Sequence, residues 1–200
     1  MAQSLATFEP TRSMRLLGLF GVIGAVLLLW AFISFNPFVD PRVNSIRLLA
    51  FSLAGAAISL AFYRRQALVA PTLALLTTGA VVIAGLWSST VLILSSGVER
   101  PFIGTFGLIG LFANIALFVT PAIWALGLLA WLAGRSPDLP SWVSPLGIVL
   151  GLVLVITWLA RLIVLDATSM LVLGPALVSG LLSPVFFLLL GAWLLGWRRQ

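Results

Sequence analysis

Residues 16–35 read LLGLFGVIGAVLLLWAFISF, a run without a single charged side chain. A helix needs about 20 residues to cross the hydrocarbon core of a bilayer, and this run has that length. It follows Arg12 and Arg15, the kind of basic flank that membrane spans carry. The run is longer than the apolar region of a typical secretory signal peptide, and no small-residue cleavage motif follows in AFISFNPFVDP at 31–41. We therefore predict a retained first membrane span.

The rest of the chain has the same apolar character. Of its 200 residues, 62% are hydrophobic and 8% are charged, and the mean hydropathy is +1.21. Soluble domains carry about 25% charged residues, so this chain could not cover its own surface in water. We predict an all-α, polytopic bundle of six transmembrane helices, with cytoplasmic tails at 1–15 and 198–200. The predicted spans are residues 16–35, 48–63, 67–94, 102–132, 143–165 and 170–197.

The basic residues set the expected orientation. All 11 are arginines, and with both termini in the cytoplasm seven lie on the cytoplasmic side and four on the other. Membrane proteins place their excess of basic residues inside, so we predict an N-in, C-in topology. Because the arginines flank the apolar blocks singly and in pairs, the net charge of +6 indicates membrane orientation and not nucleic-acid binding.

Several classes of chemistry are excluded by residues that the chain lacks. It has no cysteine and no histidine, so it has no disulfide and no metal or haem site built on those ligands. Without lysine it cannot form a Schiff base. The carboxylates lie in predicted tails or loops, so no pair converges inside the membrane, and we expect a protein that is not an enzyme and has no cofactor. These carboxylates are Glu9, Asp40, Glu99, Asp138 and Asp166.

Two glycine-rich stretches are nearly alike, GLFGVIG at 18–24 and GTFGLIG at 104–110. A phosphate-binding glycine loop follows a strand and opens a helix, and neither stretch has that context. Small residues inside membrane helices let backbones approach each other, so we interpret these glycines as a helix-packing surface, with substrate contact as the alternative. On a helix, each three-residue step turns back by about 60°, which makes a slanting strip. The candidate packing residues are Gly18, Gly21, Gly24, Gly104, Gly107 and Gly110.

The positions of the two stretches also raise the question of a duplication. They open the first and the fourth predicted spans. A three-span unit copied once must insert upside down, so this placement is compatible with the 3+3 inverted repeat of many transporters. The difference in residue number between matching features of the two halves is not constant along the chain, so the sequence does not decide whether the halves are a repeat.

A few polar residues near the predicted membrane boundaries are functional candidates. Arg161, at the end of the fifth span, could clamp an anion, with Asp166 or Glu99 orienting it, while Arg100 belongs to the same outer side. The alternative is that Arg161 extends to the lipid headgroups or pairs with a carboxylate. Asn114, inside the fourth span, could line a polar pocket or form a hydrogen bond between helices.

Two stretches resemble a known group of proteins. GRSPDLPSWVSPLGIVLGLVLVI at 134–156 and LLLGAWLLGWRRQ at 188–200 are similar to the C-terminal half of bacterial six-span proteins known only as a domain of unknown function. TRSMRLLGLFGVIGAVLLL at 11–29 is similar in style to their first span. The resemblance implies a six-helix bundle in a bacterial inner membrane and brings no catalytic residue. In size and span count the chain also resembles the vitamin-binding membrane subunits of energy-coupling-factor importers, but we do not find their small-residue docking motif.

The expected function is that of a non-enzymatic accessory or interaction protein in the bacterial cytoplasmic membrane. Its expected partners are the lipid bilayer and another membrane protein or a second copy of the chain; no small-molecule ligand is identified. The alternative is a small-solute transporter or a substrate-binding membrane subunit. The first hypothesis predicts a bundle closed by side chains, and the second predicts a midplane site between inverted halves.

Overall fold

The computed structural model describes residues 11–33, 41–96, 139–164 and 169–196. Over these residues the chain forms five helices and no strand, so the all-α prediction is confirmed for this part. Three segments are long and apolar enough to cross a membrane, namely Arg12–Trp30, Val143–Ala160 and Met170–Leu194. The helices are α1 (Arg12–Ile33), α2 (Pro41–Val69), α3 (Pro71–Ser96), α7 (Val143–Ile163) and α8 (Met170–Leu194).

The second and third helices differ from the spans predicted for them. α2 contains the predicted span 48–63 but continues through Arg64 and Arg65 to Val69. The charge-free part of α2, residues 48–63, covers about 24 Å of helix. α3 begins at Pro71 and ends at Ser96, whereas the span predicted for it was 67–94. The predicted fourth span, 102–132, lies outside the described residues.

Local sequence signals account for the ends of the helices. Thr11 precedes α1, and its hydroxyl accepts a hydrogen bond from the Met14 N–H at 3.4 Å. α2 and α3 each begin at a proline, which lacks the N–H that would have no partner in a first turn. Ser169 caps α8 by accepting from the Leu171 N–H. Gly196 follows α8 with φ +92°, a left-handed conformation that glycine adopts without strain.

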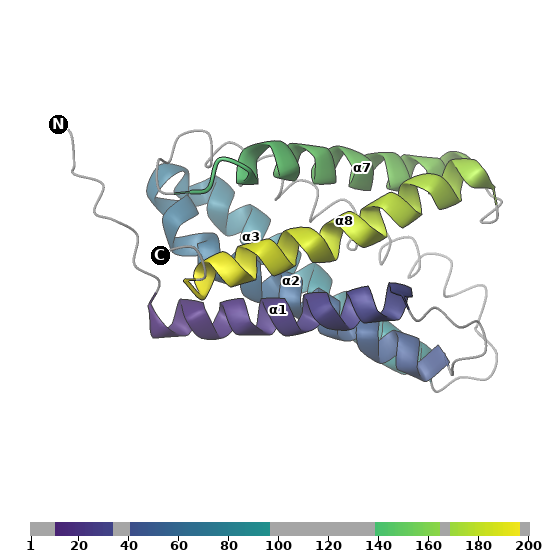
Figure 1. Ribbon diagram of the computed structural model, residues 1–200, viewed down its shortest axis with the longest axis horizontal. Coiled ribbons are helices and arrows are strands. Elements are labelled where there is room, and N and C mark those ends of the chain that lie inside the picture. The colour runs from purple at the N-terminus through teal and green to yellow at the C-terminus, as the bar shows by residue number, and fades with distance from the viewer. Residues whose placement is uncertain (1–10, 34–40, 97–138, 165–168, 197–200) are drawn as a thin grey trace.

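α8 occupies the centre of the described bundle (Figure 1). It packs against α1, α7 and α2, while α2 also packs against α1 and α3. α2 runs antiparallel to α1 and to α3, and α8 runs antiparallel to α7; a single residue, Ala70, separates α2 from α3. As a result α1 begins, and α8 ends, at the same end of the bundle, where the α2–α3 turn and the start of α7 also lie.

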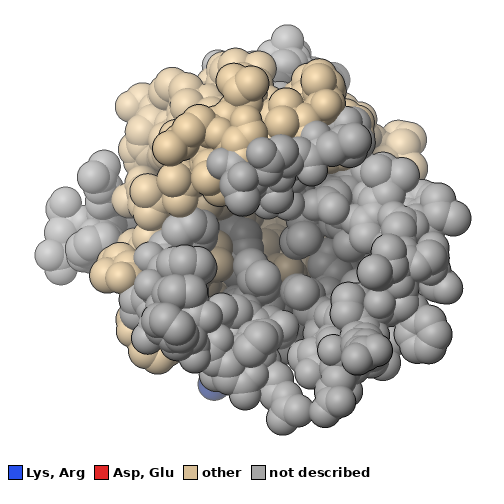
Figure 2. Space-filling view, turned by 90° about the vertical axis from the view of Figure 1, so that its right-hand side faces the viewer, with Lys and Arg blue, Asp and Glu red and all other residues tan. Residues whose placement is uncertain are grey.

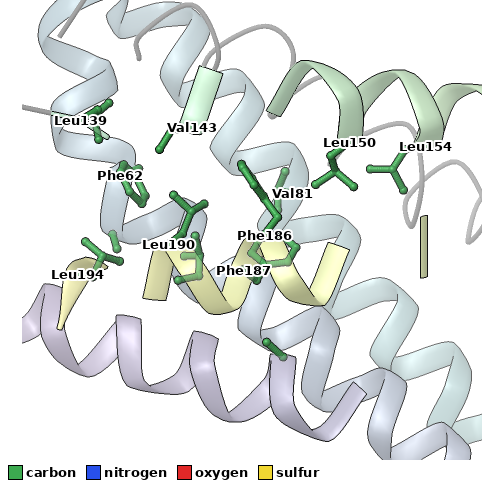
Figure 3. Close-up of a cluster of buried hydrophobic side chains, with 13 residues drawn as sticks. Phe62, Val81, Leu139, Val143, Leu150, Leu154, Phe186, Phe187, Leu190 and Leu194 are labelled. Carbon is green, nitrogen blue, oxygen red and sulfur yellow. The ribbon is translucent and has the colours of Figure 1, made fainter. Parts of the chain in front are cut away.

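Aromatic side chains pack together toward this end, which we call the closed end. Phe62 of α2 stacks on Trp193 of α8 with ring centroids 5.9 Å apart. Trp142, just before α7, meets Phe186 edge-on at 6.4 Å, and Phe186 in turn contacts Phe187. Figure 3 shows the surrounding apolar side chains converging from α2, α7 and α8. They include Leu139, Val143, Leu150, Leu190 and Leu194, all buried.

The opposite end also presents exposed apolar side chains. Ile33, Ile163 and Met170, which lie at the ends of α1, α7 and α8, are 83%, 78% and 82% exposed. In Figure 2, which faces this end, the described surface is tan, with a little blue at its lower margin and no red among the described residues. Lipid rather than water is the solvent that suits such side chains.

Candidate functional site

Two glycines bring α1 and α8 into close contact. A Cβ placed on Gly191 would lie 2.7 Å from the Gly18 carbonyl oxygen and 2.8 Å from Val22 Cγ2. A Cβ placed on Gly18 would lie 2.8 Å from Leu194 Cβ. Only glycine fits at such distances, so each glycine allows the backbone of the other helix to approach it.

The predicted glycine strip of α1 faces two different helices. Whereas Gly18 meets α8, a Cβ on Gly21 would overlap the Ile58 side chain of α2. Gly24 is also buried. The turn between these positions therefore lets α1 fit between α8 and α2, as a slanting strip would allow. The corresponding glycines at 104, 107 and 110 lie outside the described residues.

Beside the glycine contact, α1 and α8 border an open groove of about 520 Å³. Its lining is apolar and is formed by Val22 of α1 and by residues at the end of α8. Ligand pockets occupy about 300–1,000 Å³, so the groove is large enough to hold a chain molecule or part of one. The other described lining residues are Leu188 and Ala192 of α8, with Leu195 and Gly196 just after it.

The closed end is also basic. Arg12 and Arg15 in the first turn of α1 are exposed, as is Arg64 near the end of α2, whereas Arg65 is half-buried. The part of the chain that the structure describes contains no aspartate or glutamate. The described charged side chains at this end are therefore all positive, and such groups attract anions.

Most hydroxyl groups in the interior bond to their own helix. Ser59 donates to the Ala56 carbonyl at 2.8 Å, and Thr157 donates to the Val153 carbonyl at 2.7 Å. Thr157 also lies 3.4 Å from the Ser179 hydroxyl, which links α7 to α8. These hydroxyls therefore bond mainly within their own helices, and the Thr157–Ser179 pair adds a polar contact between α7 and α8.

Gln66 is a buried side chain whose polar atoms are not bonded within the described part of the chain. It is 0% exposed, and neither Oε1 nor Nε2 has a hydrogen-bond partner among the described residues. The Thr78 hydroxyl of α3 is likewise buried without a partner in this part of the chain. A buried amide without partners is unfavourable by about 1–3 kcal/mol, so Gln66 is a polar group to which a further partner could bind.

The sequence did not single out Gln66, because residues 64–66 were expected to form the loop after a span that ends at Tyr63. The signal that could have identified it is helical periodicity. Ile58, Phe62 and Gln66 follow each other at four-residue spacing, and all three are fully buried. Gly191 was also missed, since its importance depends on which helix lies opposite.

The predicted charged and amide candidates are not brought together in the described structure. Arg161 lies in the last turn of α7, where only its backbone is described. Asp166, Glu99, Arg100 and Asn114 lie outside the described residues. The anion clamp and the Asn114 pocket therefore stay predictions.

Comparison with known proteins gives no relative from which a function could be transferred. The chain matches no protein-family model, and no curated protein and no solved structure is similar to it.

Proposed function

We propose that this chain is a six-span protein of a bacterial cytoplasmic membrane, with both termini inside, and that it acts as a non-enzymatic accessory or interaction subunit. The length and apolar character of α1, α7 and α8 support the membrane location. The start of α1 and the end of α8 lie at the same basic end, as the positive-inside rule expects of an N-in, C-in chain.

The observation that carries the proposed role is the backbone contact between Gly18 and Gly191. It brings the backbones of α1 and α8 together, and the buried apolar core packs α8 against α2 and α7. The hydroxyls of Ser59, Thr157 and Ser179 donate to carbonyls of their own helices, so their hydrogen atoms are not available to bind a solute. A bundle closed in this way suits a protein that presents fixed outer faces to a partner.

The alternative is a small-solute transporter or a substrate-binding membrane subunit. Gln66 and Thr78 favour it, because their polar atoms have no partner among the described residues and could bind a polar solute. This alternative predicts a bound small molecule that depends on Gln66.

Native mass spectrometry of the detergent-purified full chain separates the two functions. The accessory role predicts a complex of fixed stoichiometry with another membrane protein or with a second copy. The matched variant Gln66→Leu should leave that complex intact. A bare monomer that carries a small molecule of discrete mass, lost in Gln66→Leu, would instead establish the alternative and overturn the proposed role.

A further inference from the structure

The α1–α8 groove combines an apolar lining with a basic rim. On α8 its lining residues Leu188, Ala192 and Leu195 repeat at four and three residues, so they form one stripe on the helix surface. The stripe leads toward Gly196, at the closed end of the bundle. Because Ala192 has a small side chain, the middle of this stripe protrudes little from the surface of α8.

The rim is provided by the first turn of α1. Val22 lines the groove, and Arg15 stands seven residues before it, which is two helical turns on the same face. The two positions are separated by about 10 Å along the helix axis. Arg12 is the neighbour of Arg15 one turn further out, and both side chains are exposed. A molecule lying along the groove would therefore meet apolar surface at one end and guanidinium groups at the other.

We propose that this groove binds an anionic phospholipid, with an acyl chain along Val22, Leu188 and Ala192 and the phosphate group near Arg15 and Arg12. The charge match supports an anionic headgroup, since arginine binds phosphate oxygens with its fork of N–H donors. Basic pockets between membrane helices are general sites for anionic lipid headgroups.

The position of the groove favours a lipid over a soluble ligand. It is open along the outside of two helices, both of which are long and apolar enough to span a bilayer. An acyl chain enters such a groove from the membrane without leaving an apolar environment. A water-soluble anion has no apolar part to occupy Val22 and Leu188, so it would use the rim alone.

The test is native mass spectrometry of the delipidated full chain in detergent, titrated with phosphatidylglycerol or with phosphatidylethanolamine of identical acyl chains. The wild type should bind phosphatidylglycerol more tightly than phosphatidylethanolamine. Arg15→Gln should weaken phosphatidylglycerol binding about fivefold, the effect expected of one arginine near a lipid surface. Arg64→Gln is the matched control, because it removes the same charge at the same end of the bundle but away from α1.

A second pair of variants tests the apolar part of the site. Ala192→Phe should fill the groove and weaken binding of both lipids, whereas Leu177→Phe, at an exposed position of the same helix, should leave binding unchanged. Each variant is checked for an unchanged helical circular dichroism spectrum. If Ala192→Phe perturbs the fold, Ala192→Leu takes its place as a smaller filling substitution.

Three results would overturn the proposal. Equal affinity for the two lipids would remove the role of the headgroup charge. Equal weakening by Arg15→Gln and Arg64→Gln would show diffuse attraction by the basic end and not a site on α1. Unchanged binding in the filled-groove variant would show that the acyl chain lies elsewhere.

Discussion

Replacing Gly191 with alanine tests the α1–α8 contact directly. The added methyl group would lie 2.7 Å from the Gly18 carbonyl oxygen and 3.2 Å from the Val22 backbone nitrogen. Backbone atoms cannot rotate away as the end of a flexible side chain can, so one helix must move. Overpacking of this kind typically destabilises a protein by about 1–3 kcal/mol.

A second effect of the substitution acts in the opposite direction. Alanine is favoured over glycine in a helix by about 1 kcal/mol, so the cost of Gly191→Ala measured alone would be partly hidden. Gly79→Ala in α3 supplies the control, because no heavy atom lies within 4 Å of a Cβ at that position. Both variants gain the helix preference, and only Gly191→Ala meets the steric clash. We therefore expect Gly191→Ala to be less stable than Gly79→Ala by about 1–3 kcal/mol.

The free energy of unfolding can be measured by titrating sodium dodecyl sulfate into mixed micelles and following tryptophan fluorescence and far-ultraviolet circular dichroism. The comparison between variants uses the same detergent mixture and protein concentration. If the two alanine variants unfold at the same detergent fraction, α1 and α8 do not approach as closely as described, and the packing argument for both glycines is wrong.

Two further predictions concern polar groups in the interior. Gln66→Met removes an amide without partners while keeping a long flexible side chain, so it should leave stability unchanged or raise it by about 1–3 kcal/mol in the same unfolding assay; a clear loss would show that the amide is bonded. Because the chain has no native cysteine, Thr157→Cys with Ser179→Cys should form a disulfide between α7 and α8 on oxidation, since the two hydroxyls are 3.4 Å apart. The pair Thr157→Cys with Ser183→Cys, one turn away, should react more slowly, and equal rates would contradict the α7–α8 register.

Helix positions were predictable where apolar runs and local end signals coincide. The run at 16–35 marks α1, and the predicted spans beginning at 143 and 170 begin where α7 and α8 do. The length of α2 was less predictable. Arg64 and Arg65 mark the edge of an apolar run, but a charged side chain does not interrupt the backbone hydrogen bonds of a helix, so α2 continues to Val69.

The sequence indicated what type of contact the helices make, but not which residues meet in that contact. The spacing of Gly18 and Gly21 indicates a strip where another helix can approach, but nothing local says that Gly18 meets Gly191 while Gly21 meets Ile58. That assignment depends on how α1 is rotated between α8 and α2. The sequence alone likewise predicts that Gln66 lies in a loop. Its place on the buried face of α2 becomes clear only when its four-residue spacing from Phe62 is combined with the burial of both side chains.

The distribution of contacts along α8 suggests which part of the bundle sets the arrangement of its helices. Lipid removes the hydrophobic drive that holds soluble helices together, so association rests on close packing and a few hydrogen bonds. At the closed end α8 supplies Gly191 to α1, Trp193 to α2 and Phe186 to the segment before α7. Toward its start, by contrast, Met170 and Leu171 are largely exposed. The closed end therefore fixes how α1, α2 and α7 are placed around α8, and the proposed lipid site lies beside this fixed contact.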